Sequence, residues 1–193
     1  KKIIPKDTYQ DQLFDEPIEV ATNYEWAKRV IKGVKKKAGD KGKQLIYRCF
    51  LSEQTGIEML IYHFVRSAMS NTENVVENYR DDKILALHKI NKKIGREVHR
   101  MHAFVRFQKT KDDIYAAIIE PDFNVLPLIG DHFEKRYPAQ QWLIYDTRRH
   151  YGIFYDFHKT TFITFDQPDH QSLSHLSKEI LTTDEPDYQV LWK

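Results

Sequence analysis

The spacing of apolar residues changes once along the chain, and this change most constrains the fold. Before about residue 102, apolar side chains recur every three or four positions, which is the repeat of an α-helix. From residue 104 onward they alternate with polar residues, as strands with one buried face do. The pattern predicts an α+β fold, with a helical N-terminal half packed on an antiparallel ββαβββ half.

In the first half we expect helices over about 23–37, 43–69 and 82–101. Thr22 or Asn23 can cap the first helix, and Asp81 or Asp82 suits the positive end of the third. Residues 35–43 hold five Lys and two Gly, which predicts a solvated basic turn, and Gly56 can interrupt the second helix.

In the second half we expect five strands and one helix, which spans about 124–137. The predicted strands are 104–108, 114–120, 142–145, 151–157 and 161–165. We expect one domain, 1–193, comprising mainly helical residues 1–101, a sheet with one helix over 102–166, and a partly helical tail over 167–193. Packing of rings in the core explains the 13% aromatic content better than base stacking does.

Composition excludes several classes of protein. No run approaches the roughly 20 apolar residues of a membrane span. Cys49 is the single cysteine, so no internal disulfide can form, and a cytoplasmic location is expected. The chain holds no phosphate-binding glycine loop and no cysteine cluster, so we predict no cofactor. The net charge of +2 does not by itself indicate a nucleic-acid partner.

The third predicted helix carries a row of cations. Spacings of four, three and four place these residues on one polar face, and Lys92 widens it: Lys89, Lys93, Arg96 and Arg100. Such a row can neutralise consecutive phosphates of DNA and release their counterions. The alternative is an ordinary solvated face of a surface helix.

A second basic feature lies between two predicted strands, where Arg148 and Arg149 precede Tyr151. Guanidinium groups at a hairpin tip can bind phosphate through paired hydrogen bonds, and a tyrosine ring can stack on a base. The alternative is a turn that carries surface arginines.

Catalytic candidates are fewer. Glu120 and Asp146 follow predicted strands, and a glycosylase can work with one carboxylate that activates water. Structural roles compete with this one, namely turn formation for Asp146 and helix capping for Asp122. Glu97 and His99 form another possible pair, with network roles at a helix end as the alternative. His99 and His102 have a spacing that can share a metal, but nothing nearby completes a ligand set, so no metal site is predicted.

Four longer strings resemble the signature of a bacterial family described as probable DNA metabolism or putative DNA repair proteins. They are YRCFLSE at 47–53, GREVHRMHAFVRFQ at 95–108, IEPDFNVLPL at 119–128 and WLIYDTRR at 142–149. Family members are typically encoded beside a radical-SAM protein, and some are fused to a uracil-DNA-glycosylase-like domain. They usually have a short segment before the equivalent of residue 1 and continue past the equivalent of Lys193.

The resemblance and the cations together lead to three hypotheses. The first is an accessory protein of DNA repair or modification that works with a radical-SAM partner. Its predicted DNA contacts are Lys89, Lys93, Arg96, Arg100, Arg106, Arg148, Arg149 and Tyr151. The second is a DNA-processing enzyme of glycosylase type that uses Glu120 or Asp146. The third is a protein-interaction subunit whose cations only solvate its surface.

Overall fold

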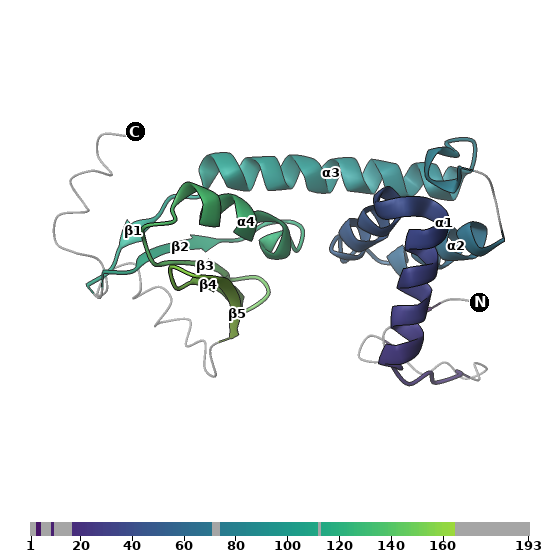
Figure 1. Ribbon diagram of the computed structural model, residues 1–193, viewed down its shortest axis with the longest axis horizontal. Helices are drawn as coiled ribbons and strands as arrows, with labels where there is room; N and C mark the ends of the chain where they lie inside the picture. The colour runs from purple at the N-terminus through teal and green to yellow at the C-terminus, as the bar shows by residue number, and fades with distance from the viewer. Residues whose placement is uncertain (1–2, 5–8, 10–16, 71–73, 112, 165–193) are drawn as a thin grey trace. The chain divides into compact units, whose positions relative to one another are not determined.

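The computed structural model describes residues 3–4, 9, 17–70, 74–111 and 113–164. The predicted tail over 167–193 lies outside these residues. Contacts within the chain divide it into two compact units, unit 1 (residues 1–95) and unit 2 (residues 96–193), and each is described by itself. The element order, helices first and then a five-stranded sheet with one inserted helix, confirms the predicted α+β class (Figure 1).

Unit 1 is helical. It contains α1 (Tyr24–Phe50), α2 (Ile57–Met69), a short 3-10 helix η2 (Val75–Glu77) and the first part of α3 (Asp82–Phe104). The predicted cap of α1 is Asn23, whose Oδ1 accepts a hydrogen bond from the Trp26 backbone N at 2.9 Å. Gly56, at φ 83°, separates α1 from α2 as expected.

The basic turn predicted for residues 35–43 is wrong. The chain stays helical through these residues and only kinks at Gly39, where φ is 67°. Glycine reaches this left-handed conformation without a steric penalty, so one residue redirects the helix and no loop is needed. The five lysines of this segment are exposed on the helix surface.

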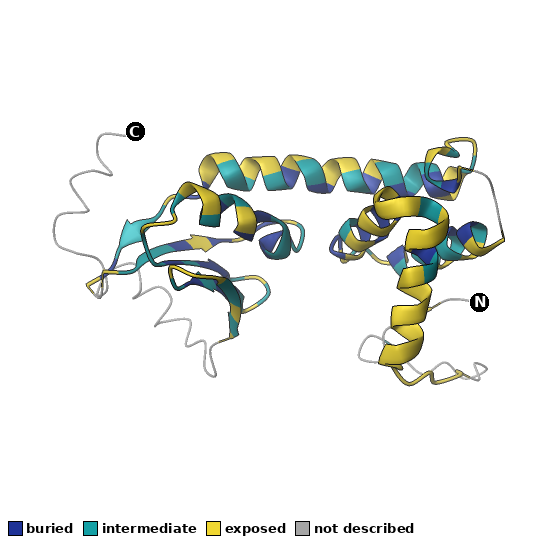
Figure 2. Cartoon of the chain, in the orientation of Figure 1, coloured by how far each residue is buried: buried dark blue, intermediate teal, exposed yellow. Residues whose placement is uncertain are grey.

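The core of unit 1 is formed by the apolar stripes of its helices, shown in dark blue in Figure 2. This core includes Phe64 from α2 and Ile84, Leu87 and Ile94 from α3, and the side chains of all four are 0% exposed. Cys49 belongs to this core: its Sγ lies 3.2 Å from the Leu87 carbonyl oxygen, and burial raises the pKa of the thiol to about 12. A thiol with so high a pKa is held in its unreactive protonated form.

The N-terminus of α3 is capped by Asp81, one of the two predicted candidates. Its Oδ1 accepts hydrogen bonds from the backbone N of Lys83 at 2.8 Å and of Ile84 at 3.3 Å. Its Oδ2 lies 2.7 Å from His63 Nε2. The hydrogen bond with His63 is the main reason why the pKa of Asp81 is lowered. The cap therefore also links α3 to α2 inside unit 1.

Unit 2 contains the end of α3, one further helix and a five-stranded sheet. The elements are β1 (Gln108–Lys109), β2 (Tyr115–Ile119), α4 (Leu126–Arg136), β3 (Trp142–Asp146), β4 (Tyr151–Tyr155) and β5 (Thr160–Thr164). The strands lie in the order β1-β2-β3-β4-β5. The first strand is shorter than predicted, because α3 continues to Phe104 and leaves two residues for β1.

One strand pair differs from the predicted antiparallel sheet. β2 and β3 are parallel, with Ile119 opposite Asp146, whereas the other pairs are antiparallel. The reason is the connection: α4 carries the chain back over the sheet, so β3 starts at the same end as β2. The carboxyl ends of β2 and β3 therefore meet at one edge of the sheet.

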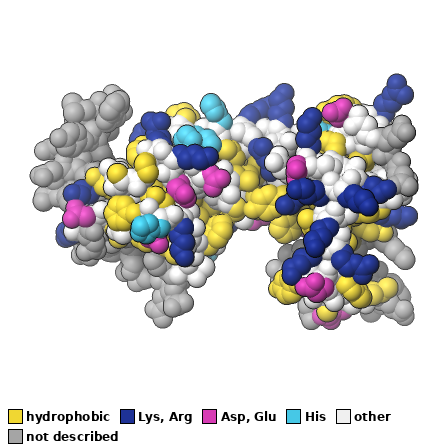
Figure 3. Space-filling model, viewed as in Figure 1, with side chains coloured by type: hydrophobic (Ala, Val, Ile, Leu, Met, Phe, Trp, Pro, Cys, Tyr) yellow, Lys and Arg dark blue, Asp and Glu magenta, His cyan; other side chains and the backbone are white. Residues whose placement is uncertain are grey.

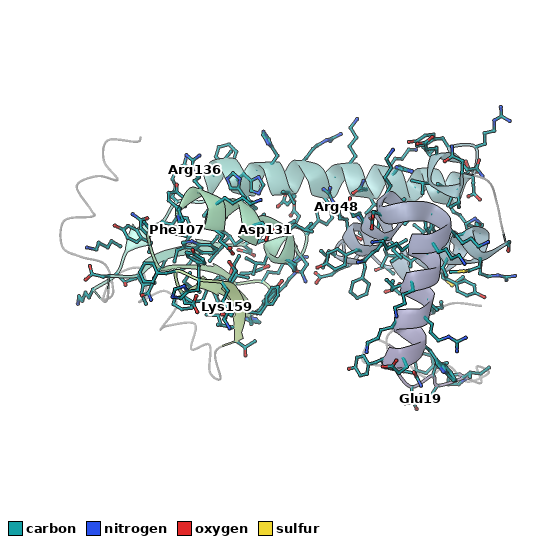
Figure 4. The ribbon with its side chains drawn as sticks, in the orientation of Figure 1. Glu19, Arg48, Phe107, Asp131, Arg136 and Lys159 are labelled. Carbon is teal, nitrogen blue, oxygen red and sulfur yellow. The ribbon has the colours of Figure 1, made fainter. Side chains whose placement is uncertain are left out.

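The core of unit 2 lies between α4 and the sheet. Gly130 of α4 packs closely there, since a Cβ at this position would lie 3.5 Å from Thr160 and 3.6 Å from Ile153. Several aromatic rings fill the rest of the space, including Phe107, which is labelled in Figure 4. Phe107 meets Phe133 at 5.5 Å, and Trp142 stacks on Tyr155 at 5.4 Å between ring centroids. Much of the aromatic content is thus core packing, as expected.

Candidate nucleic-acid interface

One face of α3 carries five cations, all of them exposed: Lys89, Lys92, Lys93, Arg96 and Arg100. At about 100° per residue, these five side chains fall within an arc of roughly 100° around the helix axis. The buried residues of α3, such as Ile90 and Ile94, lie on a different side of the helix. The helix therefore forms the cationic row that the residue spacing predicts.

Four of these cations are not engaged within the protein. Lys89, Lys92, Lys93 and Arg96 form no ion pair with any residue that the structure describes, and we call these four the α3 cationic face. The first three belong to the unit 1 part of α3 and Arg96 to the unit 2 part. None of the described residues compensates their charge.

The cations of α1 provide a contrast. On the face drawn in Figure 3, Lys and Arg side chains also gather over α1. Two of them are paired within their own helix, Lys28 with Glu25 at 2.9 Å and Lys35 with Asp40 at 3.0 Å. Two cations of α1 are thus paired with acids of their own helix, whereas none of the four cations of the α3 cationic face is paired with a described residue.

The fifth cation of the row, Arg100, forms ion pairs with two acidic residues of unit 2. Its guanidinium contacts the Glu97 carboxylate and lies 3.4 Å from Asp122 Oδ2. Glu97 is only 2% exposed, and its Oε1 accepts a hydrogen bond from the Asp122 backbone N at 3.1 Å. Glu97 and Arg100 thus tie α3 to the β2–α4 loop (residues 120–125), which is the network role weighed for Glu97.

The loop is held from its other side by the turn between β3 and β4. Arg149 donates hydrogen bonds to the carbonyl oxygens of Pro121 at 3.1 Å and Asp122 at 3.2 Å. Arg148 reaches the same Asp122 oxygen at 3.4 Å. Two predicted binding residues from distant parts of the chain, Arg100 and Arg148, therefore meet at Asp122, and both remain exposed.

The Arg149 side chain lies mostly inside unit 2. It is 9% exposed, and its Nη1 lies 2.9 Å from Oδ2 of Asp146, which is 0% exposed. Asp146 Oδ1 also accepts hydrogen bonds from the backbone N of Arg148 at 2.9 Å and of Arg149 at 3.2 Å. These are the contacts of a residue that forms a turn, the structural role weighed for Asp146.

The remaining carboxylates are placed differently. Glu120 follows β2 directly and is exposed. The capping role weighed for Asp122 is wrong: α4 begins after Val125, and no side chain caps it. Pro at the start of α4 has no backbone N–H to satisfy, which reduces the need for such a cap.

Tyr151 and Arg106 are both held by nearby groups. The Tyr151 hydroxyl donates a hydrogen bond to Asn124 Oδ1 in the β2–α4 loop, and its ring lies 6.1 Å from Phe162. Arg106 donates from Nη1 to the carbonyl oxygens of Ala103 at 2.7 Å and Val105 at 3.2 Å, and so closes the C-terminal end of α3.

The described residues around the histidines near the end of α3 do not complete a metal site. His99 is exposed, and His102 stacks on His132 of α4 with ring centroids 3.8 Å apart. Among the described residues, no three His, Cys, Asp or Glu side chains come together in a way that could hold a metal ion. Burial is the main cause of the lowered pKa of His102, followed by the charges of His132 and His99.

This lowered pKa predicts a pH dependence of stability. His102 binds a proton less readily in the folded protein than in the unfolded chain, where its pKa is 6.5. The free energy of unfolding should therefore fall as the pH drops from about 7 to about 5. Replacing His102 with Gln should flatten this fall, measured by chemical denaturation at several pH values. Replacing the exposed His158 with Gln is the control, and equal flattening by both changes would contradict the prediction.

Comparison with known families identifies the chain at the level of a family. Residues 55–193 match the model of a family described as a domain of unknown function, DUF4130. The chain belongs to this family. The match includes α2, α3 and all of unit 2, and hence each of the predicted binding residues. No curated protein and no solved structure matches the chain significantly.

One further property bears on the class of protein. None of the helices in the described part of the chain combines the length and apolar character needed to cross a membrane.

The residue patterns did not identify all the residues of this region. The role of Asp122 as the common contact of Arg100, Arg148 and Glu97 was missed, and so was that of Asn124 as the partner of Tyr151. The available signal was the string EPDFN directly after a strand, since polar residues at a strand end often stand at a site.

Proposed function

We propose that the chain is a DNA-binding accessory protein of DNA repair or modification, and that α3 supplies its main phosphate contacts. The observation that carries the proposal is the α3 cationic face, with four exposed cations and no internal counter-charge among the described residues. Binding of such cations to phosphates releases condensed counterions from DNA without breaking an ion pair in the protein.

Arg100 and Arg148 would extend the contact into unit 2. Both residues are exposed and lie 3.4 Å from atoms of Asp122, and Arg100 also keeps its ion pair with Glu97. Arg149 and Arg106 would instead act mainly by shaping the loop and the helix end, because their guanidinium groups already bind backbone oxygens. A radical-SAM protein is the proposed partner, and the four strings that resemble the DNA repair family support this part.

The buried carboxylates favour the accessory role over a glycosylase. Asp146 and Glu97 each have both carboxylate oxygens engaged by donors of the protein itself. A carboxylate that activates water needs an oxygen that can reach that water. Glu120 is exposed, and Asp146, which the register of β2 and β3 brings to the same edge of the sheet, is engaged by Arg149.

Neutralising two cations of α3 tests the proposal. Each phosphate contact contributes on the order of tenfold in affinity at about 50 mM salt. The double substitution Lys93→Gln and Arg96→Gln should therefore weaken binding of duplex or single-stranded DNA by about a hundredfold. Fluorescence anisotropy with a labelled oligonucleotide measures the change.

The matched control is the pair Lys135→Gln and Arg136→Gln. These residues are exposed at the end of α4, and their substitution changes the net charge equally. We expect this control pair to weaken binding only slightly. An equal loss in both double variants would show that net charge, and not the α3 cationic face, governs binding.

A further inference from the structure

Unit 1 contains a polar pocket that plays no part in the proposed DNA contact. Its volume is about 230 Å³, below the roughly 300–1,000 Å³ of sites for drug-sized ligands. α1 contributes Lys41, Gln44 and Arg48, α3 contributes His88 and Asn91, and Tyr79 lies between these helices in sequence. The pocket is therefore sized for a small polar ligand.

Arg48 is the unusual residue of this pocket. It is half-buried, and its Nε is inaccessible to solvent without a hydrogen-bond partner among the described residues. Arg48 forms no ion pair with any acidic residue that the structure describes, so its charge is not compensated there. A buried N–H donor without a partner is unfavourable, and an anion in the pocket would supply that partner.

The backbone of α3 leaves space for this guanidinium. Figure 4 shows Arg48 on α1, and the residue opposite it on α3 is Gly95. A Cβ at Gly95 would lie 3.3 Å from Arg48 Nη2, which is closer than most such contacts. Glycine is less favourable than alanine inside a helix, so its presence is explained by the room that it gives Arg48.

The other polar groups of the pocket add to this arrangement. Asn91 Oδ1 is buried without a partner among the described residues. Lys41 and Glu77 face each other across 3.8 Å and largely offset one another, which leaves Arg48 as the net charge. Tyr79 lies against the His88 ring with centroids 4.8 Å apart, and His88 Nε2 is held by the Val76 carbonyl oxygen at 2.6 Å.

We propose that this pocket binds a phosphomonoester, with Arg48 as the main ligand of its phosphate. A guanidinium donates two parallel hydrogen bonds to phosphate oxygens and suits this group better than an ammonium does. Asn91 Oδ1 accepts a hydrogen bond from a hydroxyl of the ligand, and the exposed ring of Tyr79 contacts its sugar or base. Such a phosphate belongs either to a free nucleoside monophosphate or to the end of a DNA strand.

This proposal is separate from the DNA contact of α3, because its residues lie outside the α3 cationic face and it can hold if that face binds no DNA. Calorimetric titration of the full chain tests it with four probes. They are inorganic phosphate, a deoxynucleoside 5′-monophosphate, and one oligonucleotide with and without a 5′-phosphate. Saturable binding of the monophosphate would identify a nucleotide site, and a gain in affinity from the 5′-phosphate alone would identify a strand-end site.

Substitution of Arg48 decides whether the pocket is responsible. Arg48→Gln should weaken the binding of each phosphomonoester by about tenfold or more, and Arg48→Lys should weaken it less. Arg66→Gln, an exposed substitution on α2, should leave it unchanged. The oligonucleotide without a 5′-phosphate should bind Arg48→Gln and the parent protein equally, which separates this test from that of α3.

Thermal unfolding completes the test. Because Arg48 has no partner to lose among the residues that the structure describes, Arg48→Gln should unfold at the same temperature as the parent protein or higher. A lower temperature would show that Arg48 is structural and would overturn the proposal. It would also be overturned if no phosphomonoester bound saturably, or if the parent and Arg48→Gln bound it equally.

Discussion

Replacing Asp146 with Asn should lower the free energy of unfolding of unit 2 by about 3–5 kcal/mol. Asp146 is 0% exposed, and its partner Arg149 has a side chain that is 9% exposed, so the substitution removes a negative charge from a buried ion pair. Asp146 also accepts the two backbone hydrogen bonds that form the β3–β4 turn. Chemical denaturation followed by circular dichroism measures the loss.

Asp156 provides the matched control for this substitution. It forms a similar turn after β4, where its Oδ1 accepts hydrogen bonds from the backbone N of His158 at 3.0 Å and of Lys159 at 2.9 Å. Among the described residues it has no buried arginine partner, so Asp156→Asn should lower the free energy of unfolding much less than Asp146→Asn does. If Asp146→Asn cost no more than this control, the buried ion pair would not be what holds the β2–α4 loop in place.

Reversing three charges of the α3 cationic face should remove DNA binding. We expect the combined substitution of Lys89, Lys93 and Arg96 by Glu to lower the affinity at about 50 mM salt on the order of a thousandfold or more. Each change removes one phosphate contact and adds a repulsive charge. The three residues are exposed and unpaired among the described residues, so the fold should be retained.

Circular dichroism and thermal unfolding check that this variant is folded. Arg100 is left unchanged on purpose, because a negative charge there would face the buried carboxylate of Glu97. If the folded variant bound DNA with the affinity of the parent protein, the proposed interface would be wrong, and the basic N-terminal part of α1 would become the next candidate.

The helices and strands were predictable from the sequence where the local spacing of apolar residues determines the element. The stripe of Ile84, Leu87 and Ile94 indicates α3 because helical geometry converts spacing into a face. Strand direction was not predictable in this way, because alternation shows which side chains are buried and not where a strand starts. The parallel pairing of β2 and β3 depends on how α4 returns over the sheet. The residue pattern predicted a turn where α1 only kinks at Gly39, because glycine is typical of turns and of helix kinks.

The candidate site, like the fold, was predictable from the sequence only in part. The row on α3 follows from spacing alone, and the structure places its residues as predicted. The contacts of Arg149 do not, because they reach residues 27 and 28 positions away in the β2–α4 loop. An arginine at a turn therefore has the same sequence pattern whether it points to solvent or into the core. The uncompensated charge of Arg48 is likewise visible only once α1 and α3 are packed together.

The salt dependence of DNA affinity tests the central claim most directly. Four phosphate contacts by the α3 cationic face should contribute about −3.6 to the slope of log K against log salt concentration for duplex DNA, and contacts by Arg100 and Arg148 would add to it. In the variant with Lys89, Lys93 and Arg96 replaced by Gln, the slope should be smaller in magnitude by about 2.7, which is the share of the three lost contacts. A slope near zero for the parent protein, or equal slopes for the two proteins, would contradict the claim that this face of α3 binds DNA.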